Sequence, residues 1–135
     1  MAYWLVKSEP FKYSWDQMVK DGRTHWDGVR NHQAAANLRA MQVGDRAFFY
    51  HSNEGKEIVG VVEIVRTAYP DPGDESGKFV MVDVAPIGPV KRAVTLAEMK
   101  ADPRLADLAL IRQSRLSVVP VSDAHWGIIA ELAGV

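Results

Sequence analysis

Apolar residues follow two periods along this chain: the alternation typical of strands, and the three- to four-residue spacing typical of helices. Strand-like runs are predicted at residues 2–6, 46–52, 58–65, 79–85 and 115–121. The run from Ile58 to Val65 is almost continuously apolar, which favours a strand covered on both faces. Residues Asn53 to Lys56 form a predicted turn, so the second and third runs are expected to make a hairpin.

Helices are indicated by capping residues and by apolar stripes. They are predicted from Ser14 to about Gly22, from about Asn31 to Met41, from Thr95 to before Pro103, and from Ser122 onward. Ser14 and Thr95 are each followed three residues later by Gln or Glu, which is the spacing of a capping box. Trp15 and Trp126 lie on helical apolar stripes and are assigned to the core. Trp4 in the opening strand is also assigned to the core, with the alternative that one edge of its ring lines the site.

The order of these elements predicts the fold class. Short strands separated by short helices, without regular strand–helix alternation, favour α+β over a parallel nucleotide-binding sheet. We expect a small curved sheet or mixed β-barrel of about five to six strands, flanked by short helices. At 135 residues, without repeats or low-complexity tracts, the chain is predicted to be one domain spanning residues 1–135.

Composition narrows the function classes. The chain has no cysteine, which excludes disulfides and thiolate metal sites and fits a reducing compartment. It begins without a basic leader and has no apolar stretch of membrane-spanning length, so a cytoplasmic location is expected. The net charge of −1 argues against a protein that grips long duplex DNA mainly through phosphates. It does not argue against a pocket for one extruded or single-stranded base.

Two polar-aromatic segments, residues 26–31 and 48–53, are not explained by the needs of a core. Each places aromatic rings beside hydrogen-bonding groups, next to a short turn. Flat ligands need this combination, because a ring face is available for stacking while polar groups read the ligand edge. We therefore expect both segments to line a pocket.

The first segment contains four candidates, each with a structural alternative. Trp26 is interpreted as a pocket wall rather than pure core, because its neighbours show no apolar periodicity. Gly28 is either an ordinary turn glycine or one that lets the backbone approach the ligand closely. Asn31 can cap the following helix, contact the ligand, or do both. Arg30 is expected to hold a phosphate at the start of that helix.

The second segment and the end of the first strand supply the remaining polar candidates. Tyr50 and Ser52 share a strand face, although Ser52 can also satisfy its own backbone. His51 titrates near neutrality and has no second His or carboxylate at metal-ligand spacing, so it is interpreted as a hydrogen-bonding residue at the pocket rim. Ser8 lies at a rigid corner before Pro10, where it can read a base edge.

Three further basic residues are candidates for phosphate contacts. Lys7 follows the first strand, where a lysine is most often solvated. Arg112 and Arg115 precede the last strand and are either surface charges or forks that bind phosphate.

No catalytic constellation is evident. The motifs of serine hydrolases, P-loop proteins, dinucleotide-binding proteins and zinc proteases are absent from the sequence. Asp83 and Glu63 could pair as general acid and base, although carboxylates on strands more often face solvent. A small enzyme that uses His51 on a modified base, and an adaptor that docks another protein, remain alternatives.

The chain resembles the EVE domain family. The resemblance rests on four ordered motifs spread over nearly the whole chain, at residues 3–10, 26–31, 49–52 and 112–117. It implies a PUA-like fold, a small mixed β-barrel flanked by helices, and a reader of modified bases rather than an enzyme. Family members often have an aromatic-rich stretch before Phe79. This chain has Asp74 to Lys78 there, so we give that loop no role in binding.

The resulting hypothesis is a non-catalytic binding module for nucleic acid, DNA or RNA, that carries a modified base. The residues expected to form the base pocket are Ser8, Trp26, Gly28, Asn31, Tyr50, His51 and Ser52. Those expected to contact flanking phosphates are Lys7, Arg30, Arg112 and Arg115. No cofactor, metal or membrane is expected, and the chain is predicted to be a monomer.

Overall fold

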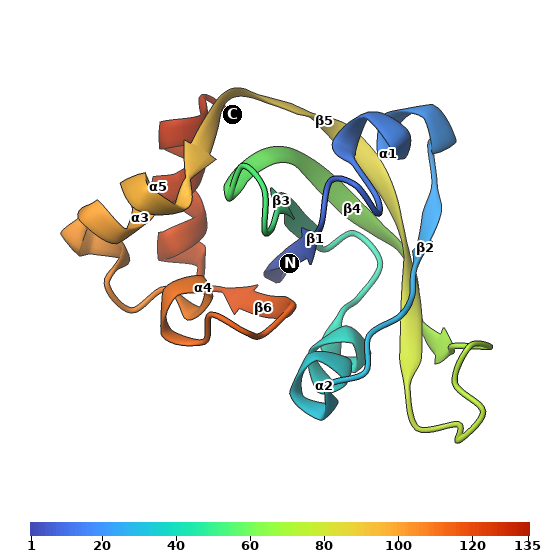
Figure 1. Cartoon of the computed structure of the whole chain (residues 1–135). Coiled ribbons are helices and arrows are strands. Elements are labelled where there is room, and N and C mark those ends of the chain that lie inside the picture. The colour runs from blue at the N-terminus through green and yellow to red at the C-terminus, as the bar shows by residue number, and fades with distance from the viewer.

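Segments far apart in the sequence pair into one six-stranded sheet in the computed structural model, which describes all 135 residues (Figure 1). In chain order the elements are β1 Tyr3–Ser8, α1 Trp15–Asp21, β2 Thr24–Trp26, α2 His32–Ala40, β3 Arg46–His51, β4 Glu57–Pro70, β5 Val80–Thr95, α3 Leu96–Ala101, the 3-10 turn η1 Pro103–Leu105, α4 Ala109–Arg112, β6 Val118–Val121 and α5 Asp123–Ala133. The α+β class predicted from the sequence is confirmed.

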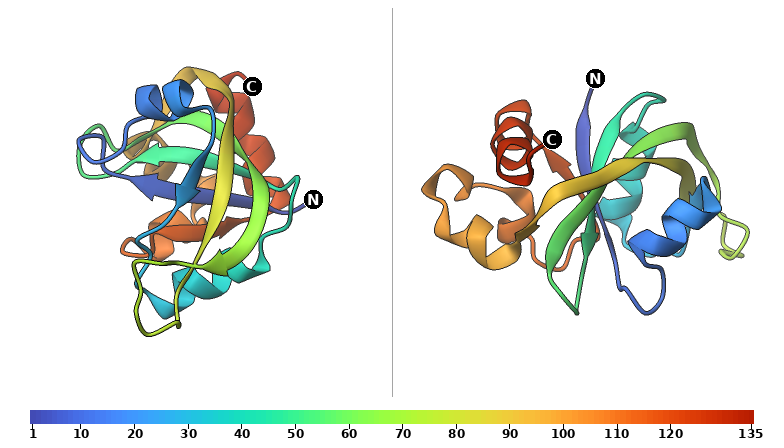
Figure 2. Two further views of the ribbon diagram at one scale, coloured as in Figure 1. Left: turned by 90° about the vertical axis from the view of Figure 1, so that its right-hand side faces the viewer. Right: turned by 90° about the horizontal axis from the view of Figure 1, so that it is seen from above.

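The strand order is β2-β5-β4-β3-β1-β6, and the sheet mixes parallel and antiparallel pairs. Strands β1 and β3 run parallel, whereas β3–β4, β4–β5, β1–β6 and β2–β5 are antiparallel. The register between β4 and β5 shifts at four points. Because such bulges bend a strand and increase its twist, these two long strands arch across the molecule (Figure 2).

Consecutive side chains of β3 point to opposite faces of the sheet, and both faces are covered by packed aromatic residues. Phe48 stacks on Trp126 of α5, with ring centroids 3.8 Å apart, and Tyr3 stacks on the same indole at 4.3 Å. On the other face Phe49 meets Trp15 and Trp26 edge to face, at 5.5 and 5.6 Å. Helices α5 and α3 thus lie on one side of the sheet and α1 on the other (Figure 2).

Helix α1 approaches the sheet closely because β4 has a glycine beneath it. A Cβ added to Gly60 would lie 2.4 Å from the indole of Trp15. Trp15 is buried, as predicted, while Trp126 is half-buried and stacks on both Tyr3 and Phe48. Trp4 is also buried, and its indole N–H donates to Asp45 at 3.1 Å.

The helix caps confirm the predicted helix starts. The side chains of Ser14, Asn31, Thr95 and Ser122 each accept a hydrogen bond from the first turn of the helix that follows. Thr95 forms the complete reciprocal capping box, and Gly22 closes α1 in the left-handed conformation.

Strand lengths were predicted less well. The strand predicted to end at Ala85 continues to Thr95, because Pro86 and Pro89 lie in the bulged part of the β4–β5 pairing, where a missing donor is tolerated. The strand predicted to start at Arg115 begins at Val118. The short elements β2 and α4 were not predicted, since three or four residues carry no measurable periodicity.

Candidate functional site

The parallel pairing of β1 and β3 brings the ends of these strands together, and the main cavity opens there. Ser8 lies opposite His51 in the register, and the Ser52 amide donates to the Ser8 carbonyl at 2.9 Å. The cavity has a volume of about 1020 Å³ and is lined by 23 residues. Its walls come from the β1–α1 turn, the segment 24–30, the β3–β4 turn, helices α3 and α4, and the segment before β6.

Most of the predicted site residues are gathered at this cavity. Those that line it are Lys7, Ser8, Trp26, Gly28, Arg30, Tyr50, Ser52 and Arg115. Asn31, His51 and Arg112 do not. Residues spread over more than a hundred positions of sequence therefore meet in one place.

Trp26 serves the core and the cavity together. It ends β2, where it lies opposite Val82 of β5, and only 8% of its surface is exposed. Its ring packs edge to face against Phe49 and lies perpendicular to Tyr13, another cavity residue. Trp26 was predicted to be a pocket wall rather than pure core. In the structure it is part of the core and also lines the cavity.

The segment after Trp26 is fixed by a residue that the sequence analysis missed. Asp71 accepts hydrogen bonds from the Gly28 amide at 3.0 Å, from Arg30 at 2.9 Å and from the Gly73 amide at 2.8 Å. Burial alone would favour the neutral acid, but these donors outweigh it and hold the pKa of Asp71 below its usual value. The sequence gives no sign that Asp71 is buried, because Asp-Pro-Gly is typical of an exposed turn.

The Asp71 carboxylate holds both Gly28 and Arg30 in position through hydrogen bonds. Gly28 has a φ of 77° and open space where a side chain would be, so its backbone is exposed at the cavity wall. Arg30 is already engaged: besides Asp71, its guanidinium lies over the Phe79 ring at 5.6 Å.

Four groups that line the cavity are either uncharged or engaged in hydrogen bonds within the protein. The Lys7 amine donates to the Ser114 carbonyl at 2.8 Å, and burial lowers its pKa. The Ser8 hydroxyl donates to the Tyr13 carbonyl at 2.6 Å. Burial raises the pKa of Tyr50, and burial together with the hydrogen bond to Asp21 raises the pKa of Tyr13 to about 12. Both phenols are therefore neutral at physiological pH.

The predicted residues outside the cavity have structural partners. His51 Nε2 lies 3.2 Å from the Trp15 amide, and burial lowers its pKa, so the neutral ring accepts this hydrogen bond at the start of α1. Asn31 caps α2 by accepting from the Ala34 amide at 2.9 Å. Arg112 donates to Asp107 at 2.9 Å. Asn31 and Arg112 line a smaller neighbouring hollow of about 360 Å³.

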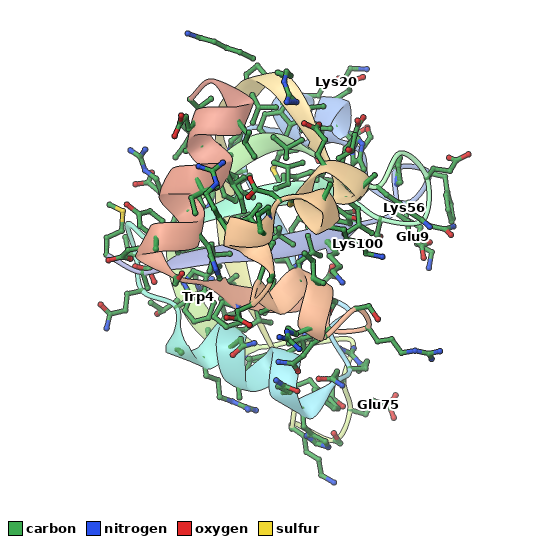
Figure 3. The ribbon with its side chains drawn as sticks, turned by 90° about the vertical axis from the view of Figure 1, so that its left-hand side faces the viewer. Trp4, Glu9, Lys20, Lys56, Glu75 and Lys100 are labelled. Carbon is green, nitrogen blue, oxygen red and sulfur yellow. The ribbon has the colours of Figure 1, made fainter.

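The cavity is basic although the chain is not. Six of its lining residues are Lys or Arg and only two are Asp or Glu, whereas the net charge of the chain is −1. Sequence analysis missed Lys12, Lys56 and Lys100, because each is isolated in the sequence and only folding brings them together. Figure 3 shows Lys56, Lys100 and Glu9 grouped at one edge of the molecule, with Lys20 apart from them.

Comparison with known proteins identifies the family. The family model described as EVE domain matches residues 2–132. The chain belongs to the EVE domain family. Human thymocyte nuclear protein 1 is 33% identical over 97% of this chain and 73% of its own length.

Solved structures of other EVE domain proteins superpose closely on this one. A protein of Rhodopseudomonas palustris is 59% identical, with a TM-score of 0.94 over 99% of this chain and 94% of that chain. A structure of human thymocyte nuclear protein 1 (THYN1) in complex with DNA containing 5-methylcytosine is 34% identical, with a TM-score of 0.92 over 100% of this chain and 99% of that chain. These structures confirm the PUA-like fold expected from the sequence.

A polar cluster at the edge of the EVE domain sheet involves Asp83, one of the two carboxylates considered as a catalytic pair. Asp83 does not bond to Glu63. It accepts from Arg23 at 3.0 Å and from the Tyr69 hydroxyl, and lies 3.1 Å from His25 Nδ1. Burial opposes ionisation, but these partners together lower the pKa of Asp83. Among the cluster residues, only His25 reaches the cavity.

No three His, Asp or Glu side chains are grouped so that they could hold a metal ion. None of the helices combines the length and the apolar character that crossing a membrane requires.

Proposed function

We propose that this EVE domain is a non-catalytic nucleic-acid-binding module that takes one modified nucleobase into the main cavity, with residues 1–135 acting as one unit. One observation carries the proposal. A slightly acidic chain concentrates six basic residues around an aromatic-walled cavity of about 1020 Å³. That volume lies at the upper end of the range for small-molecule sites, about 300–1,000 Å³, and is enough for a base with its sugar and phosphate.

The lining residues suggest a division of roles. Trp26 and Tyr50 supply the aromatic wall on which a base packs. The Gly28 amide is bonded to Asp71, so Ser52 and the Gly28 carbonyl are the groups that can read the base edge. Lys56, Lys100 and Arg115 have no ion-pair partner in the protein and are free to contact phosphates. Arg30 acts instead by holding the segment 26–30 against Asp71.

The chemistry of the base is proposed by similarity. A relative that is 34% identical over the whole chain has been solved with DNA containing 5-methylcytosine. We therefore take DNA with a modified cytosine as the ligand class and RNA as the competing one. The monomeric state and the cytoplasmic location expected from the sequence remain predictions.

The test is an affinity profile at fixed salt. Labelled oligonucleotides of one sequence, as DNA and RNA and as single strand and duplex, would carry either cytosine or 5-methylcytosine at one position. We expect tighter binding of the modified DNA, and no change in its mass after incubation. Equal affinity for modified and unmodified strands would contradict base reading. A mass change would indicate an enzyme and direct attention to His25, which pairs with Asp83 at the cavity edge.

Trp26→Ala should weaken binding of the modified strand by about 1–3 kcal/mol, the usual scale of one lost stacking contact. It should also cost about 3–5 kcal/mol of folding stability, because most of the indole is buried. The matched control is Trp126→Ala, which removes a stacked indole from the opposite face of the sheet, away from the cavity. Affinity and unfolding are measured for both. A Trp26 variant that loses stability but keeps its affinity would remove Trp26 from the site.

A further inference from the structure

Phe11 differs from every other aromatic residue of the chain in its exposure. There are twelve Phe, Tyr and Trp residues, and eleven are buried or half-buried. Phe11 is 65% exposed and has no aromatic or cationic partner in the protein. A single exposed apolar residue is common on protein surfaces, so its position decides whether it has a role.

That position is next to residues that line the main cavity. Phe11 lies in the β1–α1 turn, and Glu9, Lys12 and Tyr13 around it all line the cavity. The turn is fixed by its own hydrogen bonds: the amides of Lys12 and Tyr13 both donate to the Glu9 carbonyl at 2.9 Å. The Ser8 hydroxyl closes the turn by donating to the Tyr13 carbonyl. The ring is therefore carried on an ordered support and not on a loose loop.

A base that enters the cavity must leave the stack of its neighbours, and this exposes the flat apolar face of the adjacent base. An aromatic or apolar side chain can cover that face, as wedge residues do in proteins that unstack nucleic acids. Among Phe, Tyr and Trp, Phe11 is the one exposed ring beside the cavity. Lys12 next to it lies 3.6 Å from Glu9 but is itself exposed, so its charge also faces an approaching strand.

We propose that Phe11 stacks on the base adjacent to the one held in the cavity. The inference rests on the proposed function, because it needs a nucleic acid whose base occupies the cavity. It extends the site from one nucleotide to at least two, and it assigns a binding role to a residue that does not line the main cavity.

The experiment measures affinity for a short DNA oligonucleotide with one 5-methylcytosine, in single-stranded and duplex form. Phe11→Ala should weaken binding about 5- to 150-fold, the range for loss of one base–aromatic stack. Phe11→Trp should restore affinity, because it keeps a flat ring. Val19→Ala is the matched control, since Val19 is 53% exposed on α1 and lies outside the cavity.

A second set of oligonucleotides isolates the stack itself. An abasic site replaces the neighbour of 5-methylcytosine, on the 5′ side in one strand and on the 3′ side in another. On one of these strands the penalty of Phe11→Ala should fall to about twofold or less, because the contact it removes is already gone.

The outcomes separate the two proposals. If the wild type discriminates the modified strand but Phe11→Ala binds as tightly, the inference is wrong and the proposed function stands. A penalty that persists on both abasic strands also overturns the inference, because Phe11 would then act without a neighbouring base. If the wild type binds none of the oligonucleotides, the proposed function fails and the inference fails with it.

Discussion

At the scale of single residues, the site depends on a carboxylate that does not itself line the cavity. Asp71 is 3% exposed and gathers the Gly28 amide, the Gly73 amide and Arg30 around its two oxygens. A charged acceptor with several donors makes stronger hydrogen bonds than a neutral one. Asp71 thus sets the path of the backbone that follows Trp26, and with it the shape of the cavity wall.

Asp71→Asn should lower the free energy of unfolding near neutral pH by about 1.5–3 kcal/mol, the range for hydrogen bonds to a charged group. The pKa of Asp71 is lower in the folded protein than its usual value of 3.8, so the unfolded chain binds the proton more readily. This contribution to stability is therefore present above about pH 4 and is lost as the pH falls through the folded pKa. Urea unfolding of both proteins across this range measures the effect.

In acid, the difference in the free energy of unfolding between wild type and Asp71→Asn should become smaller. The control is Asp107→Asn, which removes an exposed ion pair with Arg112 worth about 0–1 kcal/mol. A constant difference between wild type and Asp71→Asn down to pH values well below the usual Asp pKa would mean that ionisation of Asp71 adds nothing to stability.

At the scale of elements, α1 and β4 fit together through a residue without a side chain. The Trp15 ring occupies the space above Gly60, and it also meets Phe49 of β3. Helix α1 is only seven residues long, so most of its stability comes from this contact and its two caps. His51 adds to the same contact by accepting from the Trp15 amide.

Gly60→Ala should destabilise the protein by about 1–3 kcal/mol, the usual cost of overpacking a filled interior. The added methyl would lie within 2.6 Å of three indole atoms, so the helix or the strand must shift. Gly88→Ala is the matched control, because it lies in the neighbouring strand β5 with no atom within 4 Å of an added Cβ. Thermal or urea unfolding compares them. Equal stability of the two variants would mean that α1 moves away at no cost.

At the scale of the whole molecule, the distribution of charge matters more than its sum. The net charge is −1, yet the cavity is lined by six basic residues. Of the four cations first expected to contact phosphates, Arg30 and Arg112 form ion pairs and Lys7 donates to a backbone carbonyl. Arg115 keeps that expected role as a proposal, and Lys56 and Lys100 join it.

Lys56, Lys100 and Arg115 have no ion-pair partners, so we expect the affinity for nucleic acid to depend only modestly on salt concentration. The slope of log affinity against log salt should be about −2 for a single strand, since each phosphate contact adds about −0.7. Lys56→Ala or Lys100→Ala should each make the slope shallower by somewhat less than one unit, with little change in base discrimination, because phosphate contacts position a strand without reading it. Lys20→Ala, on α1 outside the cavity, should leave the slope unchanged (Figure 3). A slope of about −6 or steeper would require an extended phosphate track in place of one cavity.

Features that depend on neighbouring residues could be predicted from the amino-acid sequence. Helix starts at Ser14, Asn31, Thr95 and Ser122 follow from side chains that bond within one turn, so they need no tertiary information. The hairpin of β3 and β4 follows from the alternation of apolar and polar residues and from a local turn. Each of the four family motifs is a run of consecutive residues and can be read directly from the sequence. The aromatic segments pointed to the region where the main cavity forms, because rings beside polar groups and turns are a local pattern too.

Features that depend on partners distant in the sequence became visible only in the folded protein. Asp71 lies in a turn motif but is buried, because residues 28 and 30 pack against it. His51 does not line the cavity, and its ring accepts a hydrogen bond from the Trp15 amide instead. Strand β5 continues through Pro86 and Pro89 because β4 bulges opposite them. The basic cavity assembles from lysines 12, 56 and 100, which no local window connects. Burial and charge clustering are sums over the whole fold, so a sequence pattern shows which groups are available but not which of them meet.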